Sequence, residues 1–187
     1  MLDQKLKPDK THGSHRQSVA NLPPSPIADG ITNEHRFSTP QSKNVDATAI
    51  EQELKAAIEG EVRFDDGSRA LYATDASNYR QIPIGVVLPK TEEDIIQTVA
   101  ICKKYSAPVL MRGGGTSLAG QCCNVAVVMD CSKYYNRILR MSKEEKTVTI
   151  QTGIVLDDMR HTTEREIGLT FGPDPATHNH CTLGGML

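Results

Sequence analysis

The sequence contains no long apolar run. No window approaches the roughly 18 apolar residues that a membrane-spanning helix needs, and the N-terminus lacks the apolar core of a secretory signal peptide. We therefore expect no transmembrane segment and predict a cytoplasmic protein.

An excess of charge of either sign is also lacking. Lys and Arg number 21, Asp and Glu number 23, and the formal net charge of the 187 residues is −2. Hydrophobic residues make up 38% and charged residues 24%, which is typical of soluble globular proteins. Because no basic face is implied, we expect no nucleic-acid partner.

The cysteines form no C-x-x-C pair, so neither a disulfide scaffold nor a zinc ribbon is indicated, and structural thiols are expected. His178, His180 and Cys181 lie close together and carry zinc-binding groups. However, alternate residues of an extended chain point to opposite sides, and no second ligand group follows at a familiar interval. We therefore expect no metal site.

Residues 1–45 are rich in proline and polar residues and show no apolar period, which predicts a disordered tail. A targeting peptide is the alternative, but Asp3, Asp9, Asp29 and Glu34 spoil the acid-poor character of an organellar transit sequence. The ordered domain is expected to span residues 46–187.

The first part of this domain is expected to alternate helices and strands. Asp46 can cap a helix that carries Ile50, Leu54 and Ile58 on one face and ends at Gly60. A short strand is expected at 62–64, a turn at 65–67 and a buried strand at 84–88.

Thr91–Asp94 is a variant capping box that predicts the start of the next helix. We expect this helix to bury a stripe formed by Ile95, Ile96, Val99 and Ala100. A strand at 109–111 follows it, and a helical crossover of this length makes the strands on either side parallel.

The later part predicts a strand at 125–129, an antiparallel hairpin of 137–141 with 147–150, and a helix from about 155 to 166 ended by Gly168. Leu183–Leu187 is apolar and glycine-rich and is expected to be strand-like. The fold class predicted from these elements is α+β, a mixed α/β arrangement without internal repeats.

Three consecutive glycines and a fourth five residues later follow the strand at 109–111, in the run RGGGTSLAGQ from Arg112 to Gln121. Glycine clusters of this kind usually indicate positive φ angles or a close approach to another group. A Walker A loop is excluded because Gln121 and Cys122 stand where Lys and Ser or Thr are required. The dinucleotide fingerprint fails at Leu118, where its third glycine should stand.

Two interpretations of this glycine loop remain from the residues alone. Its backbone amides can form an anion-binding nest, helped by the hydroxyls of Thr116 and Ser117 and by the charge of Arg112 at its edge. Alternatively, the glycines only permit a sharp bend.

The run Arg112–Gln121 strongly resembles the pyrophosphate-binding loop of FAD-linked oxidases of the vanillyl-alcohol oxidase type, which carry a PCMH-type FAD-binding domain. The segments 87–95, 153–157, 172–177 and 181–185 are similar to further motifs of that family. Within that family the sequence is most similar to the D-2-hydroxyacid dehydrogenase branch, which includes glycolate oxidase flavoprotein subunits, D-lactate dehydrogenases and D-2-hydroxyglutarate dehydrogenases. Leu71–Tyr79 and Gln121–Asn124 resemble the long members of that branch, which carry a cysteine-rich iron–sulfur region further along the chain.

The resemblance implies a PCMH-type FAD-binding fold with a complete first subdomain and a truncated second one. It implies two sets of cofactor-binding residues. The loop set is Arg112, Gly113, Gly114, Gly115, Thr116, Ser117, Gly120 and Gln121, and the second set is Gly153, Pro173, Asp174, Thr177, Thr182, Gly184 and Gly185. For Gly153 a tight turn is an equal alternative, and for Asp174 a binding or turn role is expected rather than that of a general base. Tyr72, Asp75 and Tyr79 are open between packing and surface roles.

Some members of the family attach FAD covalently through a histidine in the loop. No histidine, and no cysteine before Cys122, stands in this one, so we expect noncovalent FAD. The resemblance implies oxidation of a 2-hydroxy acid to the 2-oxo acid, with electrons passing to an acceptor that the sequence does not identify. In relatives the substrate domain, the catalytic residues and, in long members, an iron–sulfur region lie further along the chain.

The sequence ends inside a motif that continues in relatives, so we expect an N-terminal FAD-binding portion without catalytic residues of its own. A noncatalytic flavin-binding module and an inactive, unstable remnant are the alternatives.

Overall fold

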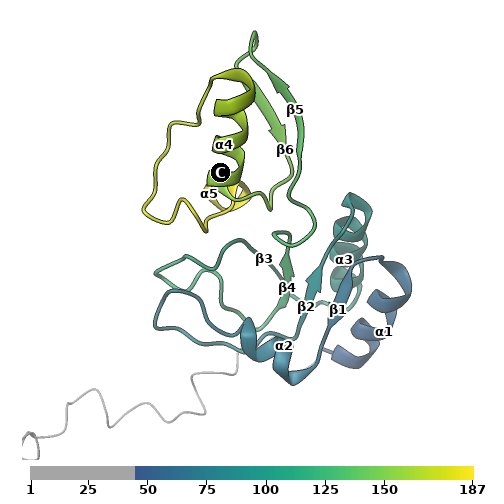
Figure 1. Ribbon diagram of the computed structural model, residues 1–187. Coiled ribbons are helices and arrows are strands. Elements are labelled where there is room, and N and C mark those ends of the chain that lie inside the picture. The colour runs from purple at the N-terminus through teal and green to yellow at the C-terminus, as the bar shows by residue number, and fades with distance from the viewer. Residues whose placement is uncertain (1–44) are drawn as a thin grey trace, which may run out of the picture. The chain divides into compact units, whose positions relative to one another are not determined.

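The computed structural model describes residues 45–187, so the predicted tail lies outside it apart from Val45. The described residues form the mixed set of helices and strands that the sequence predicts (Figure 1). In chain order the elements are α1 (Ala47–Ala57), β1 (Glu61–Arg63), α2 (Asp66–Leu71), β2 (Gly85–Leu88), α3 (Glu92–Lys104), β3 (Val109–Arg112), β4 (Val127–Asp130), β5 (Ile138–Ser142), β6 (Thr147–Ile150), α4 (Leu156–Ile167) and α5 (Leu183–Met186). No helix in residues 45–187 combines the length and the apolarity that a membrane span requires.

The larger sheet has four strands in the order β1-β2-β4-β3. β2 and β3 each pair with β4 in parallel, while β1 pairs with β2 in antiparallel fashion. The predicted parallel crossover from β2 through α3 to β3 is therefore confirmed. β4 lies between these two strands, so β2 and β3 are not neighbours.

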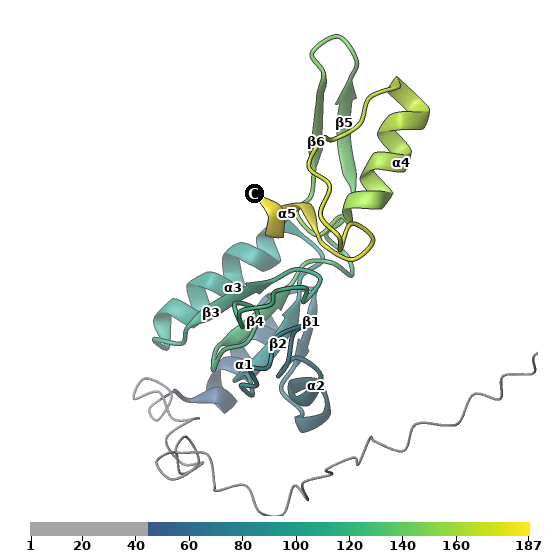
Figure 2. The same cartoon turned by 90° about the vertical axis from the view of Figure 1, so that its left-hand side faces the viewer.

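The main core lies between this sheet and the two helices α1 and α3 (Figure 2). Ile50 and Leu54 of α1 are fully buried against Ile101 of α3 and against Val87 and Met129, which are paired in register on β2 and β4. All residues of β2 and β4 are buried, as expected for central strands covered on both faces. Full burial of an apolar side chain such as Val87 or Met129 contributes about 1.5–3 kcal/mol.

The first two helices begin at aspartates. Asp46 caps α1 as predicted, and its Oδ1 accepts the amide of Ala49 at 3.0 Å. The predicted end of α1 at Gly60 is wrong, because Ile58 is already extended. The turn predicted at 65–67 is wrong too, because Asp65 accepts the amide of Ser68 at 2.8 Å and thereby starts α2.

The capping box of α3 is confirmed, but its predicted apolar stripe is wrong. Ile96 and Val99 are 52% and 45% exposed, whereas Asp94, Thr98, Ile101 and Cys102 form the buried face. Asp94 and Thr98 can be buried because the polar groups of both side chains form hydrogen bonds within the protein. The Asp94 carboxylate accepts the amides of Glu59, Lys90 and Thr91, and the Thr98 hydroxyl donates to the Asp94 carbonyl at 2.6 Å.

A second, smaller core joins the antiparallel hairpin of β5 and β6 to α4 and α5. Leu156 and Met159 of α4 pack there with Leu183, and α4 ends at Gly168 with φ 69°, as predicted. The prediction of a strand-like segment over Leu183–Leu187 is wrong. Leu183 enters this core from the single helical turn α5, in which the Gly185 amide donates to the Thr182 carbonyl.

Candidate functional site

The glycine loop leaves the sheet at the carboxyl edge of its parallel strands. β3 ends at Arg112, which is paired in register with Asp130 at the end of β4, and the loop begins at the next residue, Gly113. Ligands of open α/β sheets bind at this edge, outside the carboxyl ends of the strands. The sheet therefore places the loop where a binding site is expected.

The loop offers a run of unpaired backbone amides. Gly115 and Gly120 have φ angles of 68° and 80°, which side-chain-bearing residues rarely adopt, so glycine is required at these bends. Within residues 45–187, the amides of the four consecutive residues Gly114–Ser117 donate to no protein acceptor. Consecutive free amides at such a turn can hold an anion.

The loop also packs closely against a segment from the C-terminal part of the chain. A Cβ atom at Gly114 would lie 2.1 Å from the carbonyl oxygen of His180, and one at Gly113 would lie 2.5 Å from the Thr182 hydroxyl. Gly114 has no room for a side chain because a backbone carbonyl stands there, and at Gly113 the Thr182 hydroxyl would have to move. The glycines therefore serve close packing in addition to the bends, and anion binding by the loop stays a prediction.

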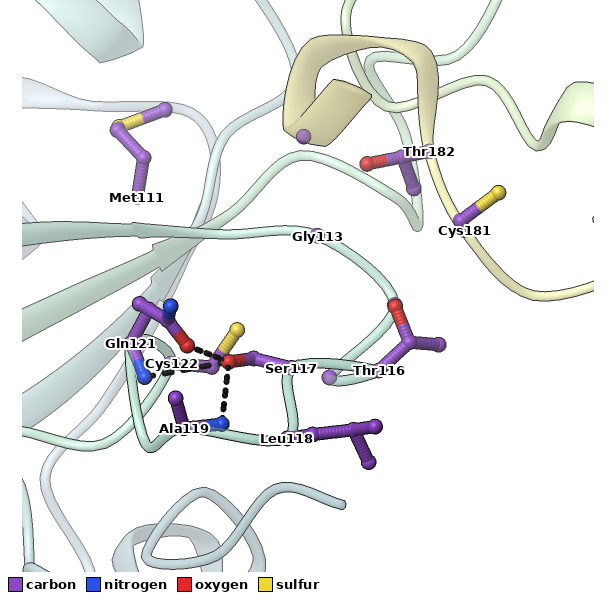
Figure 3. A pocket seen from close by; sticks show the side chains of 13 residues that line it. Met111, Gly113, Thr116, Ser117, Leu118, Ala119, Gln121, Cys122, Cys181 and Thr182 are labelled. Carbon is purple, nitrogen blue, oxygen red and sulfur yellow. Dashed lines mark hydrogen bonds between the residues drawn. The ribbon is translucent and has the colours of Figure 1, made fainter. Parts of the chain in front are cut away.

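A cavity of about 540 Å³ lies between the loop and this segment (Figure 3). Its volume is within the range of small-molecule and cofactor sites, about 300–1,000 Å³. It is lined by Met111, Gly113, Gly114, Gly115, Thr116, Ser117, Leu118, Ala119, Gln121, Cys122, Cys181, Thr182 and Gly185.

A second cavity of about 220 Å³ shares four lining residues with the first, Met111, Gly113, Thr182 and Gly185. Its other lining residues are Arg112, Cys131, Thr152, Gly153 and Gly184. The two hollows therefore meet at Gly113 and Thr182, where an elongated ligand could occupy both.

The hydroxyl groups at the cavity divide into two kinds. The Ser117 hydroxyl donates to the side-chain oxygen of Gln121 and accepts the amides of Ala119 and Gln121 at 3.4 and 3.3 Å, so it closes the loop on itself (Figure 3). The hydroxyls of Thr116 and Thr182 form no hydrogen bond with the described residues and remain available to a ligand.

The side chain of Arg112 is engaged by the protein. Its guanidinium donates to the carbonyl oxygens of Thr74 at 2.8 Å, Cys122 at 3.1 Å and Tyr72 at 3.5 Å, and it lies 5.2 Å from the centre of the Tyr72 ring. The guanidinium of Arg112 therefore joins the start of the loop to its end at Cys122 and to the neighbouring segment at Tyr72 and Thr74. Arg112 also lines the smaller cavity.

Tyr72 and Asp130 form a hydrogen-bonded pair next to Arg112. The Tyr72 hydroxyl donates to Oδ2 of Asp130 at 2.7 Å, and the other carboxylate oxygen accepts the amide of Ser132 at 2.8 Å. Burial, together with the hydrogen bond to this carboxylate, raises the pKa of Tyr72 well above its usual range. The phenol therefore stays protonated and remains a donor.

The second predicted set of site residues is only partly brought together. Gly153, Thr182, Gly184 and Gly185 line the cavities. A Cβ at Gly153 would also lie 2.2 Å from the Cys131 carbonyl oxygen, so its tight turn and its place at the cavity coexist.

Pro173, Asp174 and Thr177 line neither cavity, and neither does Gly120 of the loop set. Arg160 instead donates to the Asp174 carboxylate at 2.7 Å and to the Pro173 carbonyl at 2.6 Å. This hydrogen bond and charge hold the pKa of Asp174 below its usual range. The carbonyl of Thr177 accepts the amides of His180 and Cys181, so this stretch folds onto itself.

The histidines near the C-terminus have carboxylate and amide partners. Nδ1 of His178 lies 2.7 Å from Oδ2 of Asp157, and Nδ1 of His180 lies 2.7 Å from the side-chain oxygen of Asn179. Within the described range, no three His, Cys, Asp or Glu side chains converge as metal ligands would.

Several lining residues were not predicted from the sequence. Met111, Leu118, Ala119 and Cys122 adjoin the predicted loop residues and could have been found by extending the loop at both ends. Cys181 was not among the predicted site residues, although it opens the segment 181–185 that resembles a family motif and could have been found from it.

One known family and several known proteins are similar to this chain. A family described as "FAD binding domain" matches residues 83–187. D-2-hydroxyglutarate dehydrogenase of Haemophilus influenzae is 34% identical over 133 residues, 70% of this chain and 13% of its own length. Glycolate oxidase subunit GlcD of Bacillus subtilis is 33% identical over 134 residues, 70% of this chain and 28% of its length.

Solved structures share the fold. One of an alkyldihydroxyacetonephosphate synthase superposes with a TM-score of 0.67 at 25% identity, over 75% of this chain and 31% of the other. A carbohydrate oxidase from Microdochium nivale superposes with a TM-score of 0.59 at 17% identity, over 70% of this chain and 28% of the other. In each comparison the chain spans less than a third of its relative.

Proposed function

Since the chain belongs to the family of FAD-binding domains, we propose that it is the FAD-binding portion of a flavin-dependent oxidoreductase that oxidises a D-2-hydroxy acid to the 2-oxo acid. The substrate class is supported by the names of similar proteins, which are D-2-hydroxyglutarate dehydrogenase, glycolate oxidase and D-lactate dehydrogenase. D-lactate, glycolate and D-2-hydroxyglutarate are the candidate substrates.

One observation carries the cofactor assignment. Four consecutive residues with free amides, Gly114–Ser117, line a cavity of about 540 Å³ at the carboxyl edge of the parallel strands. This donor set fits a pyrophosphate, because amide dipoles and hydroxyls can satisfy its charges without a free cationic side chain. In this arrangement the hydroxyls of Thr116 and Thr182 add two donors from opposite walls.

The remaining predicted residues have supporting roles in this proposal. Arg112, Gly120 and Gln121 fix the shape of the loop, and Gly113, Gly153, Gly184 and Gly185 let the chain approach the cofactor closely. Pro173, Asp174 and Thr177 shape the stretch that leads to the second wall.

When bound, FAD would supply the redox chemistry by accepting a hydride equivalent from the hydroxy acid and passing electrons to an acceptor. The residues of this chain would bind and orient the cofactor and exclude water from it. None of them is proposed as a catalytic acid or base, and none as a ligand of an iron–sulfur cluster.

We propose that FAD is held noncovalently. The loop Arg112–Gln121 contains no histidine and no cysteine. Cys122, which directly follows the loop, also lines the cavity. Mass spectrometry of the denatured, FAD-loaded chain should give the mass of the polypeptide alone. A flavin adduct on any residue would contradict this part of the proposal.

A flavin titration of the purified chain tests the function. We expect one FAD to bind per chain, seen as quenched flavin fluorescence. Reduction of a dye on addition of a D-2-hydroxy acid would show that this chain suffices for turnover. FAD binding without reduction would support a flavin-binding module alone. A colourless chain that binds no FAD would refute the proposal.

A further inference from the structure

The segment Tyr72–Tyr79 lies against the glycine loop but lines neither cavity. We call residues 72–79 the platform segment. It follows α2 directly, and the isolated bridge between Thr74 and Arg80 folds it back on itself. Its contacts concentrate at the two ends of the loop.

The near end of the loop is held by backbone groups of the platform segment. The amide of Ala76 donates to the Gly115 carbonyl at 3.0 Å, and the guanidinium of Arg112 reaches the carbonyl of Thr74 at 2.8 Å. Gly115 is the first of the two loop residues with positive φ, so this bond fixes a bend within the run of free amides Gly114–Ser117.

The far end is held by the carboxylate of Asp75. Its Oδ2 accepts the amide of Cys122 at 3.2 Å, while its Oδ1 accepts the amide of Ser77 at 2.9 Å and the Ser77 hydroxyl at 2.5 Å. Tyr79 completes the contact, because its ring fills the space in which a Cβ of Gly120 would lie.

The charge state of Asp75 suits this role. Burial by itself would raise the pKa of Asp75, but the hydrogen bonds from Ser77 and from the Cys122 amide outweigh it and lower the pKa below its usual range. The carboxylate is therefore ionised at neutral pH. Hydrogen bonds from an amide to an ionised acceptor are stronger than those to a neutral one.

We propose that Asp75 is a positioning residue, which holds the far end of the loop so that the amides of Gly114–Ser117 are preorganised for the pyrophosphate of the cofactor. The inference rests on the proposed function. Its physical basis is that a loop fixed before binding does not have to be ordered at the expense of affinity.

Two variants and one control test the proposal in the 187-residue chain. Asp75→Ala removes both acceptor oxygens, whereas Asp75→Asn keeps one. Asp46→Ala is the matched control, since Asp46 also accepts a backbone amide but caps the remote helix α1. We expect the Kd for FAD, measured by fluorescence quenching, to rise about 10-fold or more in Asp75→Ala, to recover partly in Asp75→Asn, and to stay unchanged in Asp46→Ala.

Unchanged FAD affinity in Asp75→Ala, or an equal loss in Asp46→Ala, would overturn the proposal. If the wild-type chain binds no FAD, the proposed function fails and hydrogen exchange of the free chain decides the inference instead. Faster exchange of the Ala76 amide in Asp75→Ala than in the wild type and in Asp46→Ala would support a loop held by Asp75. Equal exchange in all three would refute it.

Discussion

The two regions that meet at the cavity differ in construction. The first region, residues 47–130, buries two strands completely and begins its helices with side-chain caps. The second region, residues 138–187, has a hairpin of partly buried and exposed residues, and neither of its helices has a side-chain cap. The first supplies the four free amides, while the second supplies the opposite wall.

This difference suggests a division of labour. In our proposal the pyrophosphate is recognised by the region that contains the fully buried strands, because fixed dipoles lose little free energy to reorganisation. The other region supplies the His180 carbonyl and the Thr182 hydroxyl, which the glycines of the loop approach closely.

The largest effect is expected where the two regions touch. Gly114→Ala places a Cβ 2.1 Å from the His180 carbonyl oxygen, so the loop must move. We expect destabilisation of about 1–3 kcal/mol by thermal unfolding and loss of measurable FAD binding. Gly172→Ala is the control, because a Cβ there meets nothing within 4 Å. Wild-type FAD affinity in Gly114→Ala would show that the close contact does not shape the site.

A smaller effect is expected at the cap of α3 in the first region. Asp94→Asn weakens hydrogen bonds from three amides to a buried carboxylate and should cost about 2 kcal/mol at neutral pH. Burial raises the pKa of Asp94, but the amides of Lys90, Glu59 and Thr91 outweigh this and leave its pKa below the usual value.

The pH dependence follows from that direction. A lowered pKa means that the unfolded chain binds the proton more readily, so the stabilisation is complete above the ordinary Asp pKa of about 3.9. It is lost as the pH falls through the lower, folded value. Urea unfolding from pH 7 to pH 2 should show the gap between wild type and Asp94→Asn closing only below about pH 4. Asp66→Asn, at a fully exposed carboxylate, should show no comparable gap. A gap that persists at the acid end would contradict the role of the carboxylate.

The wall of the second region is probed by Thr182→Val. The change removes a free hydroxyl from a residue that is 3% exposed and keeps its shape, so the chain should stay folded. Loss of one donor should raise the Kd for FAD about 5-fold, corresponding to about 1 kcal/mol. Thr170→Val, at an exposed threonine outside both cavities, is the control. An affinity equal to that of wild type would mean that the second region contributes packing only.

The smallest effect is expected on the hairpin. Glu145 pairs with Arg140 at 2.9 Å, and both side chains are more than half exposed. Glu145→Gln should change the free energy of unfolding by less than about 0.5 kcal/mol and leave FAD binding unaltered. A larger loss in urea unfolding would show that the hairpin depends on its surface charges.

The sequence predicted what depends on neighbouring residues. The cap at Asp46, the capping box of Thr91 and Asp94, and the end of α4 at Gly168 are local patterns and are confirmed. The family resemblance is confirmed by the match over residues 83–187. The glycine loop was found in the same way, since its residues are contiguous.

Features set by distant contacts were missed. The buried face of α3 was misassigned because Asp94 and Thr98 are satisfied by hydrogen bonds that no apolar period records. The engagement of Arg112 with Thr74 and the approach of Gly114 to His180 likewise depend on the folded chain. The contact of Asp75 with the Cys122 amide follows from the folded chain alone.

The central claim is that the amides of Gly114–Ser117 bind the pyrophosphate of FAD. Amide-resolved NMR of the isotopically labelled chain, recorded with and without FAD, tests it most directly. We predict that these four amides show the largest shifts and become protected from hydrogen exchange when FAD is added. Binding of FAD that leaves the four amides unshifted and unprotected would contradict the account.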